Sequence, residues 1–181
     1  ALTNVSGGNT WNNSLSLSDN ATIGSQAGTL TLGPARPAFT ISGHNSAPEN
    51  GYVTIGNKTL TLTGAGDITF NNRIRDFAGQ EERTSYLNAT TVNYAPQTTS
   101  PGNVTINMTG TGTVTYAANA NSYTGTTTVE AGKLILGTVS NVAAPHDTAT
   151  DSFHAINGPL IIGSNSGTTT ATVQFGTGAA T

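Results

Sequence analysis

Apolar and polar residues alternate along most of this chain, in short runs that end at glycine, asparagine or aspartate. In segments 29–32, 59–62 and 133–136 every second residue is leucine. A period of two is that of a β-strand with one buried face. No window sustains apolar residues at helical spacing, and the abundant threonine, glycine and asparagine disfavour helices. The pattern therefore predicts an all-β protein built from many strands of three to six residues.

Two kinds of segment recur. Residues 59–70 (TLTLTGAGDITF) align without gaps on residues 105–116 (TINMTGTGTVTY), and the form Ala-Gly-x-Leu-x-Leu-Gly occurs at 27–33 and 131–137, with a looser copy at 157–163. Short strands also occur in β-sandwiches, but recurrence of like segments favours a β-solenoid whose turns stack at the strand spacing of about 4.8 Å. With coils of about 20 to 25 residues, the chain would form about six to eight.

The chain is predicted to be one domain, a single solenoid over residues 1–181. Residues 71–102 fit no repeat and are predicted to be a loop insertion. Residues 138–157, rich in threonine and alanine, are predicted to be a second loop. No other composition shift indicates a domain boundary.

The composition narrows the function. Thr, Gly, Asn and Ser make up 89 of the 181 residues, while charged residues are 8% and the net charge is −3. So weakly charged a chain lacks the self-repulsion of disordered tails, and six Lys and Arg residues disfavour nucleic-acid binding. The absence of cysteine excludes disulfides and thiolate chemistry. The longest apolar runs, such as 160–162, are too short for membrane insertion.

Residues 108–137 carry a more specific pattern, in which a Thr-Gly-x-Gly strand is followed by Asn-x-Tyr-Thr-Gly-x-Thr and then by Gly-x-Leu-x-Leu. This segment resembles the passenger-associated transport repeat, also called the autotransporter-associated β-strand repeat. Residues 9–33 resemble the segment that commonly precedes such repeats. Eight matching positions are assigned structural roles in the repeat: Gly110, Gly112, Asn121, Tyr123, Gly125, Gly132, Leu134 and Leu136.

The resemblance covers residues 9–33, 57–70 and 103–137, and residues 157–178 loosely. It implies a right-handed parallel β-helix on the exterior of a bacterial cell, either extracellular or on the cell surface. Such repeats usually belong to a large surface or secreted protein.

Charged residues concentrate in one segment. Six of the fifteen lie within eleven positions: Arg73, Arg75, Asp76, Glu81, Glu82 and Arg83. Arginine beside paired carboxylates is able to bind glycans or to supply acid and base groups for polysaccharide cleavage. The alternative is a solvated loop or short helical turn that leaves the solenoid.

No catalytic, cofactor-binding or metal-binding residue is assigned. His146, Asp147, Asp151 and His154 are metal-ligating residue types, but their spacing matches no metal motif and a surface loop explains them as well. No nucleophile elbow, dinucleotide fingerprint or phosphate loop occurs. The sequence therefore predicts a protein that is not an enzyme and needs no cofactor.

The leading hypothesis is a structural protein: a stalk, an adhesin segment or a self-assembling fibre subunit. Residues 1–5 and 171–175 both have strand patterns without a charged cap, which predicts end-to-end stacking of copies. The alternative for these segments is truncation of a longer passenger, in which neighbouring repeats would cover them. The second hypothesis for function is a glycan-binding or polysaccharide-degrading β-helix that uses residues 73–83.

Overall fold

The computed structural model describes residues 1–33, 52–76, 101–117, 121, 123–138, 155–156, 158–164 and 169–177. This part of the chain is all-β, as predicted, and contains no helix. It therefore contains no helix that could cross a membrane. Its strands are β1 (Leu2–Asn4), β2 (Gly8–Trp11), β3 (Leu15–Ser16), β4 (Ala21–Ser25), β5 (Thr29–Leu32), β6 (Tyr52–Thr54), β7 (Thr59–Gly64), β8 (Asp67–Phe70), β9 (Arg73–Arg75), β10 (Asn103–Met108), β11 (Thr113–Tyr116), β12 (Thr127–Thr138), β13 (Leu160–Ile162) and β14 (Ala171–Thr177).

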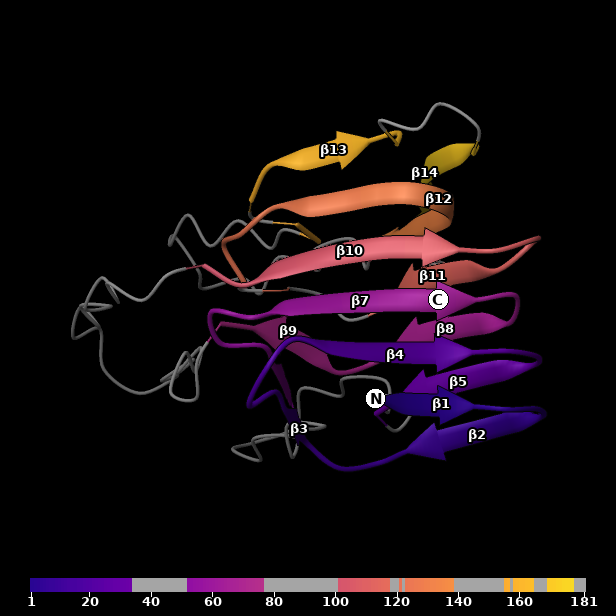
Figure 1. Cartoon of the computed structure of the whole chain (residues 1–181), viewed down its shortest axis with the longest axis horizontal. Helices are drawn as coiled ribbons and strands as arrows, with labels where there is room; N and C mark the ends of the chain where they lie inside the picture. The colour runs from indigo at the N-terminus through magenta and orange to yellow at the C-terminus, as the bar shows by residue number, and fades with distance from the viewer. Residues whose placement is uncertain are drawn as a thin grey trace, which may run out of the picture.

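The strands stack in parallel in three columns (Figure 1). The first column is β1-β4-β7-β10-β12-β13, the second is β2-β5-β8-β11-β12-β14, and the third is β3-β6-β9. Strand β12 is long enough to belong to two columns, so it joins them into one sheet that is nearly closed. A mostly parallel sheet of this shape is compatible with a β-helix or solenoid.

Inward side chains line up from strand to strand, which places the core between the columns. In the first column the register forms an aliphatic ladder of Leu2, Ile23, Leu62, Ile106, Val129 and Ile162. In the second column it forms an aromatic ladder of Trp11, Leu32, Phe70, Tyr116, Leu136 and Phe175. The members on inner strands are at most 4% exposed.

At the centre of the aromatic ladder Phe70 and Tyr116, the last residues of the two aligned segments, stack as core residues. Their ring centroids lie 5.7 Å apart, with an angle of 87° between the ring planes. This edge-to-face geometry is a favourable arrangement for two aromatic rings.

The register of the repeat differs from the gapless alignment of residues 59–70 on 105–116. The second strands pair as aligned, with Phe70 beside Tyr116. The first strands do not, because Leu60 pairs with Val104 rather than with Ile106. The cause is the corner before β11, which occupies residues 109–112, whereas the corner before β8 occupies only residues 65–66. The alignment of the first strands was therefore wrong by two residues.

Candidate interaction sites

The charged segment begins inside the fold. Arg73 and Arg75 lie on β9, which pairs in parallel with β6 in the third column. Arg75 and the following Asp76 are buried. The prediction of a loop from residue 71 therefore needs correction, since the strand stack continues through β9 and Asp76. Ile74 is fully buried and anchors this strand. The strand is hard to recognise in the sequence because an arginine stands on each side of Ile74, its only apolar residue. The remaining charged residues of the segment lie outside the described residues: Glu81, Glu82 and Arg83.

Arg75 packs along the third column. Its guanidinium carbon lies 3.6 Å from the centroid of the Tyr52 ring, and its Nε donates a hydrogen bond of 2.9 Å to Thr54 Oγ1. A cation over an aromatic face is attracted by the ring quadrupole, and more strongly when it is desolvated. Arg75 thus ties β9 to β6, and these groups serve the fold.

Asp76 links three segments that are far apart in the sequence. Its Oδ1 accepts the Gly102 N–H at 3.1 Å. Its Oδ2 accepts both the Thr124 N–H at 2.9 Å and the Thr124 hydroxyl at 2.7 Å. Hydrogen bonds to an ionised carboxylate are stronger than neutral ones. Both oxygens of Asp76 are therefore occupied by donors of this chain.

The Asn-x-Tyr-Thr-Gly part of the repeat motif extends the third column beyond β9. Asn121 is buried, accepts the Ile74 N–H at 2.8 Å and donates to the Ala155 carbonyl oxygen at 2.8 Å. The Tyr123 N–H donates to the Ile74 carbonyl oxygen at 3.3 Å. The Asn121 side chain and the Tyr123 backbone N–H here take the place of a strand, so that β9 has a partner on its second edge.

The other motif residues lie at corners or in the core. Gly110 and Gly132 have left-handed backbones, with φ of +58° and +81°. Gly112 and Gly125 are buried against the backbone of neighbouring segments, and Leu134 and Leu136 belong to the core. Of the eight motif positions, six are thus buried in the fold, Gly132 is partly buried and Gly110 is exposed at a corner.

Two tyrosines are buried, and we expect them to make the folded chain less stable at alkaline pH. Burial raises the pKa of Tyr116 well above its usual value of 10.0, and the neighbouring Tyr123 adds to this shift. Burial also raises the pKa of Tyr123, against the opposing effect of its hydrogen bond with Thr127. Both phenols therefore stay protonated in the folded chain at a pH where the unfolded chain loses those protons.

We expect the free energy of unfolding to fall as the pH rises above about 10, where unfolded tyrosine titrates. Below that pH the contribution of both groups is fully present, because folded and unfolded states bind the same protons. Above it the free energy of unfolding falls with a slope of at most about 2.7 kcal/mol per pH unit, the value for two protons. Urea unfolding between pH 8 and 11 measures this slope, and Tyr116→Phe should make it shallower. An unchanged slope in that variant would contradict the assignment.

The described part of the chain exposes large apolar side chains in its first and last layers. We call β1 and β2, with the turn between them, the first layer, and β13 and β14 the last layer. Within the described residues, the outer edges of these layers pair with no other strand. The exposed large apolar residues all belong to them: Val5, Trp11, Leu160, Ile161, Ile162 and Phe175.

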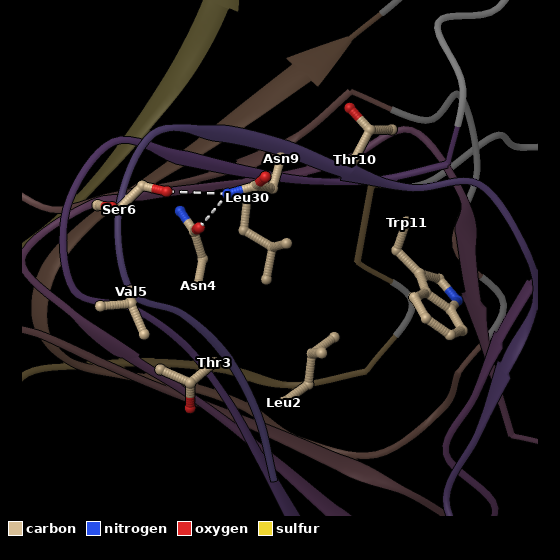
Figure 2. A pocket seen from close by; sticks show the side chains of 9 residues that line it. All are labelled: Leu2, Thr3, Asn4, Val5, Ser6, Asn9, Thr10, Trp11 and Leu30. Carbon is tan, nitrogen blue, oxygen red and sulfur yellow. Dashed lines mark hydrogen bonds between the residues drawn. The ribbon is translucent and has the colours of Figure 1, made fainter.

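The first layer and Leu30 of β5 border an open cavity of about 290 Å³. Figure 2 shows Leu2, Leu30 and Trp11 projecting into the space that the chain surrounds, while Thr10 lies on the outer side of the ribbon. Leu2 and Trp11 are the first members of the aliphatic and aromatic ladders. The cavity is therefore the exposed continuation of the core.

A polar corner borders the cavity. The Asn9 side-chain amide donates to Asn4 Oδ1 at 2.7 Å and to the Ser6 carbonyl oxygen at 2.9 Å (Figure 2). The buried Asn4 amide in turn donates to Ser25 Oγ at 3.1 Å. Both N–H groups of the Asn9 amide are thus satisfied within the layer, so this corner is already ordered.

No group of three His, Asp or Glu side chains gathers within the part of the chain that the structure describes. His146, Asp147, Asp151 and His154 lie outside that part. Comparisons with family models, with curated proteins and with solved structures find no match to this chain. The candidate site is formed by the first and last layers, because the exposed large apolar residues of the described part of the chain lie there. The strand patterns of residues 1–5 and 171–175 predicted strands in both layers.

Proposed function

We propose that this chain is a non-enzymatic structural protein of the bacterial cell exterior, a right-handed β-helix of about six to eight coils. It acts as a stalk, as an adhesin segment or as a fibre subunit that stacks end to end. The observation that carries this proposal is the distribution of exposed large apolar residues, which in the described part of the chain lie only in the first and last layers. The bacterial location rests on the resemblance of residues 108–137 to the autotransporter-associated repeat.

The sides of the stack support the same function. The outward register in the first column places threonine on four successive strands, at Thr22, Thr61, Thr105 and Thr128. These side chains are partly exposed and uncharged. The row ends in the last layer at Ile161, which is 51% exposed. A side that is polar elsewhere favours solubility, whereas apolar side chains and unpaired strand edges favour association. Contact between copies is therefore favoured along the stacking direction.

The glycan-binding or polysaccharide-degrading alternative has less support. It needs the charged groups of residues 73–83 to face a ligand, but Arg75 and Asp76 are buried and bonded within the fold. Buried charged groups that are already hydrogen-bonded serve structure more readily than they serve an external ligand.

Concentration-dependent light scattering and negative-stain microscopy test the proposal. We expect unbranched fibres of uniform width that lengthen as the concentration rises, because head-to-tail contacts do not close. Phe175→Lys places a charge in the last layer and should abolish them. The matched control Thr105→Lys places the same charge on the side of the stack and should leave them intact. A chain that stays monomeric at high concentration would count against assembly.

A further inference from the structure

We infer that the last layer of one copy docks on the first layer of a second copy with the strand register continued across the junction. In this arrangement Ile162 lies against Leu2 and Phe175 lies against Trp11. The inference rests on the proposed function, to which it adds the partner, a second copy of this chain, and the residues that meet.

The strand directions permit such a junction. All strand pairs in the first and second columns are parallel, including β12 with β13 and β12 with β14. A second copy translated along the stack presents β1 and β2 to the outer edges of β13 and β14 in the same direction. Adding a strand to an exposed edge satisfies backbone groups that otherwise face water. The contact is head-to-tail and repeats without closing.

Both ladders continue through the same junction. The aliphatic ladder ends at Ile162, which is 53% exposed, and begins again at Leu2. The aromatic ladder ends at Phe175, which is 74% exposed, and begins at Trp11, which is 42% exposed. One translation therefore covers the outermost members of both ladders. Aromatic side chains carry much of the energy of such contacts, especially when they become fully desolvated.

The alternation of side chains excludes a register shifted by one residue. With Phe175 opposite Trp11, Gln174 lies opposite Thr10. Gln174 is on the outside of the stack because it pairs with Ile135, which alternates with the buried Leu134 and Leu136. A slip by one residue would set the inward Phe175 against the outward Thr10, and the outward Gln174 against Asn9, which faces inward. Slipping would thus forfeit the apolar contact that drives docking.

The first layer leaves room for this partner. The register places Phe175 against Trp11 at the 290 Å³ cavity, whose lining includes the apolar Leu2 and Leu30 as well as polar residues such as Asn9 (Figure 2). The same register places Val173 over Asn9. Because Asn4 and Ser6 already accept both N–H groups of the Asn9 amide, covering that side chain leaves neither donor unpaired.

The absence of cysteine makes a disulfide test clean. We would mix Thr10→Cys with Gln174→Cys, each made in a separate chain, and oxidise the mixture. Directly opposed residues on neighbouring strands lie about 4.8 Å apart, within the Cα separation that a disulfide spans. We expect a covalent dimer in the mixture and in neither variant alone. The control mixture of Thr10→Cys with Thr172→Cys, also outward but two positions away, should give at least about tenfold less, because its separation exceeds that range.

Light scattering on the unaltered chain separates the two levels of the proposal. If the chain forms fibres but both mixtures crosslink equally, or neither mixture crosslinks, the proposed register is overturned. The proposed structural function then still stands. A chain that never associates would overturn both, and would assign the first and last layers to another occupant, such as further repeats of a longer chain. Circular dichroism of each cysteine variant confirms that it is folded before mixing.

Discussion

Replacing Gly64 by alanine is expected to destabilise the folded chain by about 4 kcal/mol or more, beyond the usual range for a point substitution. Gly64 ends β7 with φ of +116°, a backbone conformation that side chains with a Cβ rarely adopt. An added Cβ would meet the backbone of Ser25 in the neighbouring strand, 2.6 Å from its carbonyl carbon and closer still to its oxygen. Because that obstacle is backbone, it cannot rotate away.

Two other glycines provide matched controls for the two causes. Gly7 has φ of +76°, but nothing lies within 4 Å of an added Cβ, so Gly7→Ala tests strain alone and should cost about 1 to 2 kcal/mol. Gly8 has neither strain nor obstruction, so Gly8→Ala should change stability by less than about 0.5 kcal/mol. Urea midpoints of the three variants measure this order. Equal losses for Gly64→Ala and Gly7→Ala would show that the contact with Ser25 contributes nothing.

Asp76→Ala is expected to destabilise the chain by about 3 kcal/mol. The substitution removes the acceptor for the N–H groups of Gly102 and Thr124. The Gly102 residue is buried, and an unpaired buried donor costs about 1 to 3 kcal/mol. These segments follow Asp76 by 26 and 48 residues, so the loss loosens the stacking of segments distant in the sequence.

The control for Asp76 is Asp67→Ala. Asp67 is exposed and its Oδ1 accepts one backbone N–H, that of Thr113, at 3.0 Å. Water replaces that acceptor when the side chain is removed, so we expect a loss of at most about 1 kcal/mol. Chemical unfolding followed by circular dichroism compares the pair. Equal losses of unfolding free energy in the two variants would mean that burial of the Asp76 side chain adds nothing to stability.

The candidate sites were only partly predictable. The strand patterns near residues 1–5 and 171–175 were visible in the sequence, because alternation needs no knowledge of the rest of the chain. The role of Asp76 was not, since nothing near it marks partners as distant as Gly102 and Thr124. A run of arginine and carboxylate residues is usually a solvated surface, and the burial of Arg75 and Asp76 depends on what the fold stacks against them.

The sequence by itself determined the all-β class, the side chains that face inward along the clear strands, and the stacking of Phe70 on Tyr116. These follow from a period of two and from the recurrence of similar segments, both of which are local properties. Only the tertiary structure decided that Leu60 pairs with Val104, that Asp76 is internal, and that Trp11 and Phe175 are left exposed. A shift of two residues keeps every side chain on its own face, so corner lengths and contacts between distant segments, rather than alternation, set the register.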